Sequence, residues 1–323
     1  MLMSIESTVE EIRHGSPLLL AGDEQALRTL PAGNWIAGTT PYFMDGEGGV
    51  CTRDKVFVNR LPASAAAARI LSYTTATLPG LLDDAPDNGF TALIVPAGSP
   101  VHAAYARDAA NYPGIFIKPV VGWVAGVHMS EAAARSPLAV NGLTGIWSTD
   151  DAVAMHVTLP TGKLAEVGIV NIFHPGNGAR LQFPSTGFSA STCIVDGSPV
   201  SAASYLQSIH ADGHLPLTAD YNGSIVNVSI QEIDPWSGVV RFFAPVFEGV
   251  EYRLAAPVGD YGKKLADAAQ GDAEPDFACN CVLNYLHGQM EGRPTGCIAG
   301  PVTFGEIAHL LLNQTLVRLF IRG

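Results

Sequence analysis

The chain has 323 residues, of which 47% are hydrophobic and only 15% are charged, a composition that excludes intrinsic disorder. Its net charge is −12, from 18 Lys and Arg against 30 Asp and Glu. Because it has no run of basic residues, we expect no nucleic-acid partner and no anionic membrane surface as a partner. No apolar stretch reaches the roughly 18 residues that a membrane-spanning helix needs.

The N-terminal residues and the cysteines indicate a cytoplasmic protein. Glu6, Glu10 and Glu11 lie where a signal peptide would carry basic and apolar residues. The five cysteines are an odd number scattered between Cys51 and Cys297, which is no disulfide framework and fits a reducing compartment.

The first half of the chain predicts helices interspersed among strands. We expect a helix at 4–14 capped by Ser4 or Ser7, a short helical piece at 23–30, and a third helix at 101–111. A glycine-rich loop is expected at 45–49. Apolar or alternating runs predict strands at 17–22, 55–61, 91–95, 115–124, 152–157 and 166–173.

The second half continues this pattern with more strands. Helices are expected at 198–209 and at 259–270, the latter capped near Asp260. Strands are predicted at 188–195, 224–232, 238–243, 251–255, 277–286 and 315–321. The mixture predicts an α+β fold of mixed β-sheets with flanking helices.

Two distant parts of the chain share one order of elements. A helix, an apolar strand, an Ile-Ala-Gly turn and a second strand occur over 4–61 and again over 259–321. Such an order could arise by pseudo-symmetric duplication of an αβ unit or by chance in a glycine-rich chain. If duplication is correct, strands 277–286 and 315–321 should be neighbours in one sheet, with 17–22 and 55–61 in the same sheet or in its pseudo-equivalent.

Short motifs in the last third resemble a known family. The series runs from Val195-Asp196-Gly197 through Gly305-Glu306-Ile307 to Asn313-Gln314-Thr315-Leu316. It resembles the C-terminal part of FIST domains, which are intracellular sensory modules that bind small ligands. The resemblance is strongest over 190–323. More loosely, Ile36-Ala37-Gly38-Thr39-Thr40 is similar to the glycine-rich turn of the family's N-terminal half.

The resemblance implies a cytoplasmic small-molecule sensor. It divides the chain into a FIST N-like domain, 1–180, and a FIST C-like domain, 181–323. It also implies signalling through a separate protein, such as a kinase or cyclase acting in trans.

The polar residues of these motifs form the candidate ligand site. Asn and Gln side chains offer donors and acceptors together, which suits a zwitterion such as an amino acid. The alternative is that Glu306 and Asn313 tie down a buried turn between two terminal strands. The expected ligand-binding residues are Gly38, Thr39, Cys279, Glu306, Asn313, Gln314 and Thr315.

Two further clusters could bear chemistry. Cys279 and Cys281 would share one face of a strand, either as a metal edge or redox pair, or as two small buried hydrophobes. We expect reduced thiols without a structural metal. His210, Asp212 and His214 could hold a transition metal or haem, or could be exposed loop residues; no other cofactor is indicated.

The chain lacks the common enzyme motifs, which favours a binding protein over an enzyme. It has no nucleophile elbow, no P-loop, no zincin helix and no dinucleotide fingerprint. A hydrolase or isomerase using Cys279 or Glu306 is one alternative function. A haem or metal-dependent gas sensor is another.

Overall fold

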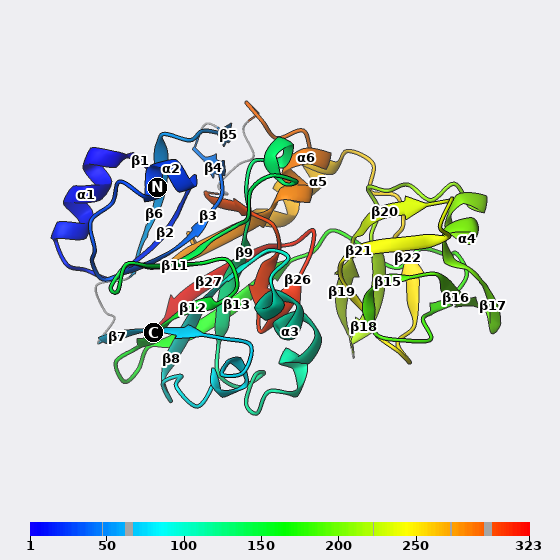
Figure 1. The fold of residues 1–323 in the computed structure, drawn as a ribbon, viewed down its shortest axis with the longest axis horizontal. Coiled ribbons are helices and arrows are strands. Elements are labelled where there is room, and N and C mark those ends of the chain that lie inside the picture. The colour runs from blue at the N-terminus through cyan, green and yellow to red at the C-terminus, as the bar shows by residue number, and fades with distance from the viewer. Residues whose placement is uncertain (47, 62–66, 222, 272, 294–298) are drawn as a thin grey trace.

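The protein is described by a computed structural model that covers residues 1–46, 48–61, 67–221, 223–271, 273–293 and 299–323. Within these residues the chain forms a large body and, beside it, a smaller β-rich lobe (Figure 1). The body contains residues up to 170 and residues from 261 onward, and the lobe contains residues 181–254. The lobe is therefore an insertion between two strands of the body.

Among the residues that the structure describes, three mixed sheets make up the body. The first has the order β1 (Leu2–Ser4), β6 (Lys55–Arg60), β2 (Leu18–Gly22), β3 (Trp35–Thr39), β10 (Ala139–Asn141), β11 (Ile146–Ser148). The second has the order β26 (Leu310–Leu312), β25 (Glu306–Ala308), β9 (Val120–Ala125), β8 (Gly89–Pro96), β12 (Ala152–Thr158), β7 (Ala67–Tyr73). The third has the order β13 (Leu164–Val170), β27 (Leu316–Arg322), β23 (Phe277–Cys281), β24 (Gly300–Thr303), β4 (Tyr42–Asp45), β5 (Gly48–Cys51).

The same strand connections occur in each of these sheets. A parallel pair, β2 with β3, β8 with β9, or β23 with β24, is joined through α2 (Glu24–Leu27), α3 (Pro100–Asp108) or α6 (Val282–His287). A further strand, β6, β12 or β27, runs antiparallel to the first member of the pair. The hairpin that follows each pair leaves its own sheet: β4–β5 joins β24, β10–β11 joins β3, and β25–β26 joins β9. This exchange links the sheets into one body.

The helices flank these sheets and are mostly short. The remaining ones are α1 (Ile5–Arg13), α4 (Ala202–Ser208), α5 (Tyr261–Ala269) and the 3-10 turns η1 (Leu78–Gly80), η2 (Ala109–Asn111) and η3 (Met129–Glu131). Helix α1 begins after Ser4, whose hydroxyl accepts a hydrogen bond from Ser7 N at 3.2 Å. Helix α5 begins after Asp260, whose carboxylate accepts one from Lys263 N at 3.0 Å. No helix of the described ranges is long and apolar enough to cross a bilayer.

The centre of the body is filled by side chains from all three sheets. The indole of Trp123 stacks on Phe277 with ring centroids 5.8 Å apart. Gly38 lies close to the indole nitrogen, where an added Cβ would come within 2.5 Å of Trp123 Nε1. Glycine is needed at this position because the indole occupies the space of a side chain.

The lobe has its own small core. One sheet has the order β17 (Ser198–Ser201), β16 (Thr192–Val195), β14 (Leu181–Gln182), β22 (Tyr252–Leu254), β18 (Leu217–Tyr221), β19 (Ser224–Val228), and the other has β15 (Gly187–Ala190), β21 (Val239–Val246), β20 (Ile230–Asp234). Between them the ring of Phe183 packs edge-on against Phe242 and Tyr252 at 5.5 and 5.6 Å.

The predicted mixture of helices and mixed sheets is confirmed. The expected pairing of β23 with β27 is also confirmed, and β2 and β6 lie together in a different sheet. The strand expected at 277–286 is wrong beyond Cys281, where α6 begins, because a short apolar run suits a buried helix as well as a strand. The helix expected at 198–209 starts only at Ala202, since 198–201 form a hairpin with β16. Similarly, the strand expected at 115–124 starts at Val120.

Candidate functional site

The segment that joins β25, β26 and β27 has an unusual backbone. His309 and Gln314 adopt positive φ values of 61° and 50°, a conformation that costs non-glycine residues about 1–3 kcal/mol. Gln314 is held there by its side chain. Its Nε2 donates to His214 O at 2.9 Å and to the hydroxyl of Tyr261 at 3.1 Å, and its Oε1 accepts from the hydroxyl of Ser229 at 2.7 Å.

Glu306 lies fully buried on β25. Its Oε2 accepts hydrogen bonds from Thr315 Oγ1 at 2.9 Å and from Thr315 N at 3.2 Å, and its Oε1 accepts one from Thr303 Oγ1 at 3.3 Å. The thiol of Cys281 also hydrogen-bonds this carboxyl group. Burial raises the pKa of Glu306 to about 8, although these hydrogen bonds oppose the shift.

A chain of buried amides connects Glu306 to the lobe. Asn284 Nδ2 donates to Thr315 O at 3.1 Å and to Asn280 Oδ1 at 2.9 Å, and Asn284 Oδ1 accepts from the Tyr261 hydroxyl at 2.7 Å. On the lobe side, Asn227 Nδ2 donates to Asn313 O at 3.1 Å. Since a satisfied polar network has few alternative arrangements, it fixes the body and the lobe relative to each other.

A small cavity lies where the body meets the lobe, and we call it the junction cavity. Its volume is about 30 Å³. Phe243 comes from the lobe, and the other lining residues come from the body. The lining residues are Met129, Phe243, Cys281, Val282, Leu283, Phe304 and Asn313.

Asn313 is the polar amide of this cavity. Its side chain is 1% exposed, and its Nδ2 donates to the neighbouring Leu312 O at 3.1 Å. Its Oδ1 is buried and has no hydrogen-bond partner. Such an unpaired acceptor costs about 1–3 kcal/mol, so its presence requires an explanation.

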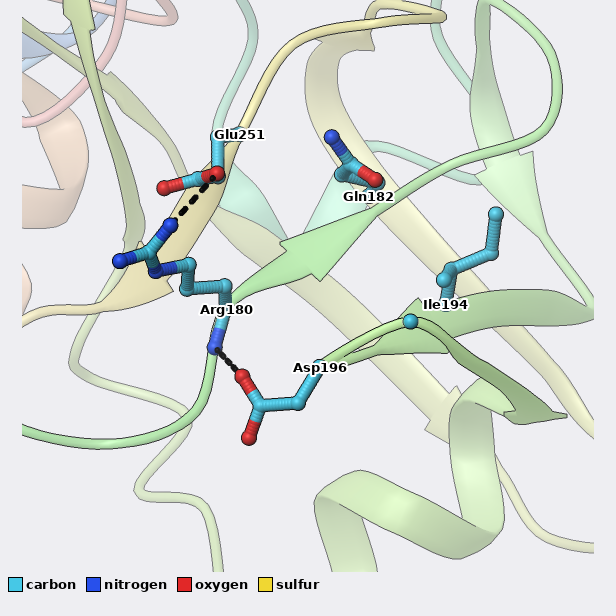
Figure 2. Close-up of a pocket in the computed structure, with 6 residues that line it drawn as sticks. Arg180, Gln182, Ile194, Asp196 and Glu251 are labelled. Atoms are coloured by element: carbon cyan, nitrogen blue, oxygen red, sulfur yellow. Dashed lines mark hydrogen bonds and ion pairs between the residues drawn. The ribbon is translucent and has the colours of Figure 1, made fainter.

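A larger hollow lies on the surface of the lobe (Figure 2), with a volume of about 420 Å³. Its charged groups already have partners within the hollow. The guanidinium of Arg180 lies 3.5 Å from the carboxylate of Glu251, and Arg180 N donates to Asp196 Oδ1 at 3.1 Å. Exposed pairs of this kind contribute little energy, and none of the sequence-predicted site residues lies there.

The structure brings together four of the sequence-predicted site residues, namely Glu306, Asn313, Gln314 and Thr315. Cys279 lies in the core two residues before Cys281, and its thiol donates to Gly122 O at 3.3 Å.

The other two predicted residues lie on β3. Gly38 faces Trp123, and Thr39 Oγ1 accepts from Leu138 N at 2.9 Å. Neither is among the residues that line the junction cavity.

Sequence reasoning missed Cys281, Asn284 and Tyr261 as parts of this site. Cys281 was visible as the second cysteine of the C-x-C motif. Nothing marked Asn284, since it lay in a segment predicted to be a strand.

The histidine cluster gives no metal site in the part of the chain that the structure describes. No group of three or more His, Cys, Asp or Glu side chains there could hold a metal ion. The imidazole of His214 instead lies 4.3 Å from that of His287, measured between ring centroids.

The chemistry of the junction favours binding over nucleophilic catalysis. Burial raises the pKa of both Cys279 and Cys281 well above the usual range, whereas a nucleophilic cysteine needs a lowered pKa. Cys279, Cys281 and Cys193 are free thiols. What the cavity offers a ligand is a hydrogen-bond acceptor within an apolar wall.

These features define a mixed α/β protein with a polar junction between a body and an inserted lobe. The chain belongs to the family of unknown function DUF6976, which matches residues 3–322. No curated protein matches the chain, and no solved structure matches it.

The resemblance to FIST domains is therefore wrong, because the family that matches nearly the whole chain is a different one. The motifs behind it are short and have a local structural cause. Glu306 and Asn313-Gln314-Thr315 hold a buried turn through hydrogen bonds, and a turn of this kind selects similar polar residues in unrelated proteins.

Proposed function

We propose that this protein binds a small molecule in the junction cavity, with Asn313 Oδ1 accepting a hydrogen bond from the ligand. The observation that carries the proposal is this buried acceptor without a partner. Every other amide of the network described above is hydrogen-bonded at both ends or through several bonds. A ligand that brings a donor would complete the network.

The position of the cavity supports this function. Ligand sites occur preferentially at interfaces between domains, and Phe243 is the lobe's contribution to this wall. The strained residues His309 and Gln314 lie in the same segment as Asn313, and such strain clusters at functional sites.

We also infer that the body arose by repetition of one structural unit. Each unit consists of a parallel strand pair with its crossover helix, a hairpin that joins a neighbouring sheet, and an antiparallel strand. Matching connections in the three body sheets support this inference. Under this proposal the site lies on the third unit, whose hairpin carries Glu306 and leads to Asn313.

The test is a thermal-shift screen of small metabolites against the wild type and two variants. Asn313→Leu removes the acceptor, and Gln182→Leu alters the hollow of Figure 2 as a matched amide control. We expect a ligand that stabilises the wild type and Gln182→Leu but not Asn313→Leu. The proposal would be contradicted by a ligand that still stabilises Asn313→Leu but no longer stabilises Gln182→Leu, or by a screen that finds no ligand.

A further inference from the structure

We infer that the junction cavity takes the ammonium group of a small primary amine, and that the charge balancing it is the buried carboxylate of Glu306. This inference rests on the proposed function and names the chemical class of its ligand. It depends on which polar atoms at the cavity lack a hydrogen-bond partner, on the size of the cavity, and on the charges that surround it.

The polar atoms of the cavity that are free to form a hydrogen bond are acceptors. Asn313 Oδ1 accepts no hydrogen bond, while Asn313 Nδ2 is already used. The other polar lining group is the thiol of Cys281, which hydrogen-bonds Glu306 and leaves its sulfur as a weak acceptor. The ligand must therefore supply the donors, and an ammonium group has three.

The size of the cavity selects a small head group. A volume of about 30 Å³ accommodates one or two groups of the size of water, since one water needs roughly 10–15 Å³ by this measure. A primary ammonium group fits this space, whereas a trimethylammonium group does not. The cavity holds the ammonium group alone, so the alkyl tail of the ligand extends out of it, and the rings of Phe243 and Phe304 favour a cation nearby.

The charges around the cavity favour a cation over an anion or a zwitterion. None of the lining residues carries a positive charge, so the carboxylate of an amino acid would find no partner here. Glu306 is the buried acid bonded to Cys281, and Thr303, Thr315 and the Cys281 thiol all donate hydrogen bonds to it. These donors suit the ionised form of the carboxyl group.

The proton balance of binding follows from this arrangement. The titratable side chains that Glu306 influences are Cys279, Cys281 and Tyr261; burial keeps all three neutral. Below pH 8, Glu306 is mostly protonated in the free protein. The amine enters as its ammonium ion, Glu306 loses one proton to solvent, and the site ends with one positive and one negative charge.

The experiment is isothermal titration calorimetry of the full chain with n-butylamine at pH 6.5, in two buffers of different ionisation enthalpy. Comparison ligands are n-butanol, which is neutral, and N,N,N-trimethylbutylammonium, which lacks N–H donors. We expect n-butylamine to bind at least about tenfold more tightly than n-butanol, with release of close to one proton. We expect no binding of the trimethyl compound.

A variant and the unmodified protein provide independent checks. Glu306→Gln should weaken butylamine binding at least about tenfold and abolish proton release, but leave butanol binding unchanged. Equal affinity for butylamine and butanol, or no proton release in the wild type, would overturn the amine inference. If the metabolite screen yields an Asn313-dependent ligand while butylamine fails to bind, the amine inference falls and the proposed function stands.

Discussion

The thiol of Cys281 and the carboxyl group of Glu306 are hydrogen-bonded to each other in the interior of the protein. Both are fully buried; the carboxyl group raises the pKa of the Cys281 thiol, whereas the hydrogen bond from that thiol favours the ionised form of Glu306. Cys281 also lines the junction cavity, so it connects a potential ligand to a buried acid that the ligand cannot touch directly. This relationship makes the protonation of Glu306 the property of the site that is easiest to measure.

The first prediction concerns stability against pH. The pKa of Glu306 is about 8 in the folded protein and about 4.5 when unfolded, so between these values the folded state holds a proton that the unfolded state lacks. Stability from this group is therefore present at low pH and lost as pH rises towards 8. Glu306→Gln should flatten this decline, as measured by urea unfolding at pH 5.5 and 8.5.

The matched control for this measurement is Glu251→Gln, at an exposed glutamate of the lobe. It should leave the decline intact. An unchanged decline in Glu306→Gln would mean that the buried carboxyl group is ionised across this range.

The second prediction concerns the acid side of the stability curve. Burial lowers the pKa of His102 to about 4 from 6.5, so below pH 6.5 the unfolded state binds a proton that the folded state does not. Stability should therefore fall as pH drops from 6.5 to 4. His102→Phe should reduce that slope, since it keeps a ring against Phe188 but removes the titration.

Urea unfolding at pH 4.5 and 6.5 measures this slope. The exposed His14 provides the control through His14→Gln. Equal slopes in the wild type and in His102→Phe would contradict the prediction.

Local features of the fold were predictable from the sequence, whereas the pairing of distant segments was not. The caps at Ser4 and Asp260 depend on neighbours within three residues; Asp260 was identified, and Ser4 was one of two candidates with Ser7. The hairpin at 42–51 was expected to contain only a loop, because its partner β24 lies some 250 residues away in the chain. No pattern in the sequence specifies such an exchange.

Some residues of the candidate site were likewise predictable from the sequence, and others were not. Glu306 and Asn313 were picked out as polar residues of the motifs that resemble FIST domains. The position of Cys281 at the cavity depends on α6 beginning directly after it, and the apolar run 282–286 does not distinguish helix from strand. The role of Gly38 also requires the structure, since the ring that it accommodates is 85 residues away.

The third prediction separates a ligand-binding amide from a structural one. Asn313→Leu removes an acceptor that has no partner, so the free energy of unfolding should stay unchanged or rise by about 1 kcal/mol. Asn284→Leu, at a neighbouring buried amide, breaks hydrogen bonds to Asn280, Thr315 and Tyr261. It should cost about 3 kcal/mol or more, because several buried groups lose their partners.

Chemical denaturation of both variants without ligand tests this difference. A loss of stability in Asn313→Leu as large as that in Asn284→Leu would show that Asn313 serves the fold. The proposed function would then lose its main support.

The last prediction concerns Gly38, which the structure places against Trp123. Gly38→Ala brings a methyl group within 2.5 Å of Trp123 Nε1 and 2.7 Å of Ile94 Cγ2, distances that force neighbouring side chains to shift. We expect a loss of about 1–3 kcal/mol. Gly213→Ala, where the added Cβ meets nothing within 4 Å, should have little effect.

A double-mutant cycle with Trp123→Phe identifies the cause. Trp123 Nε1 has no hydrogen-bond partner, so the smaller ring loses packing but no polar contact. If the crowding lies between Gly38→Ala and the indole, Trp123→Phe should relieve it, and the double variant should be more stable than the sum of the single losses predicts. Strict additivity in urea unfolding would instead place the crowding at Ile94 and not at the indole.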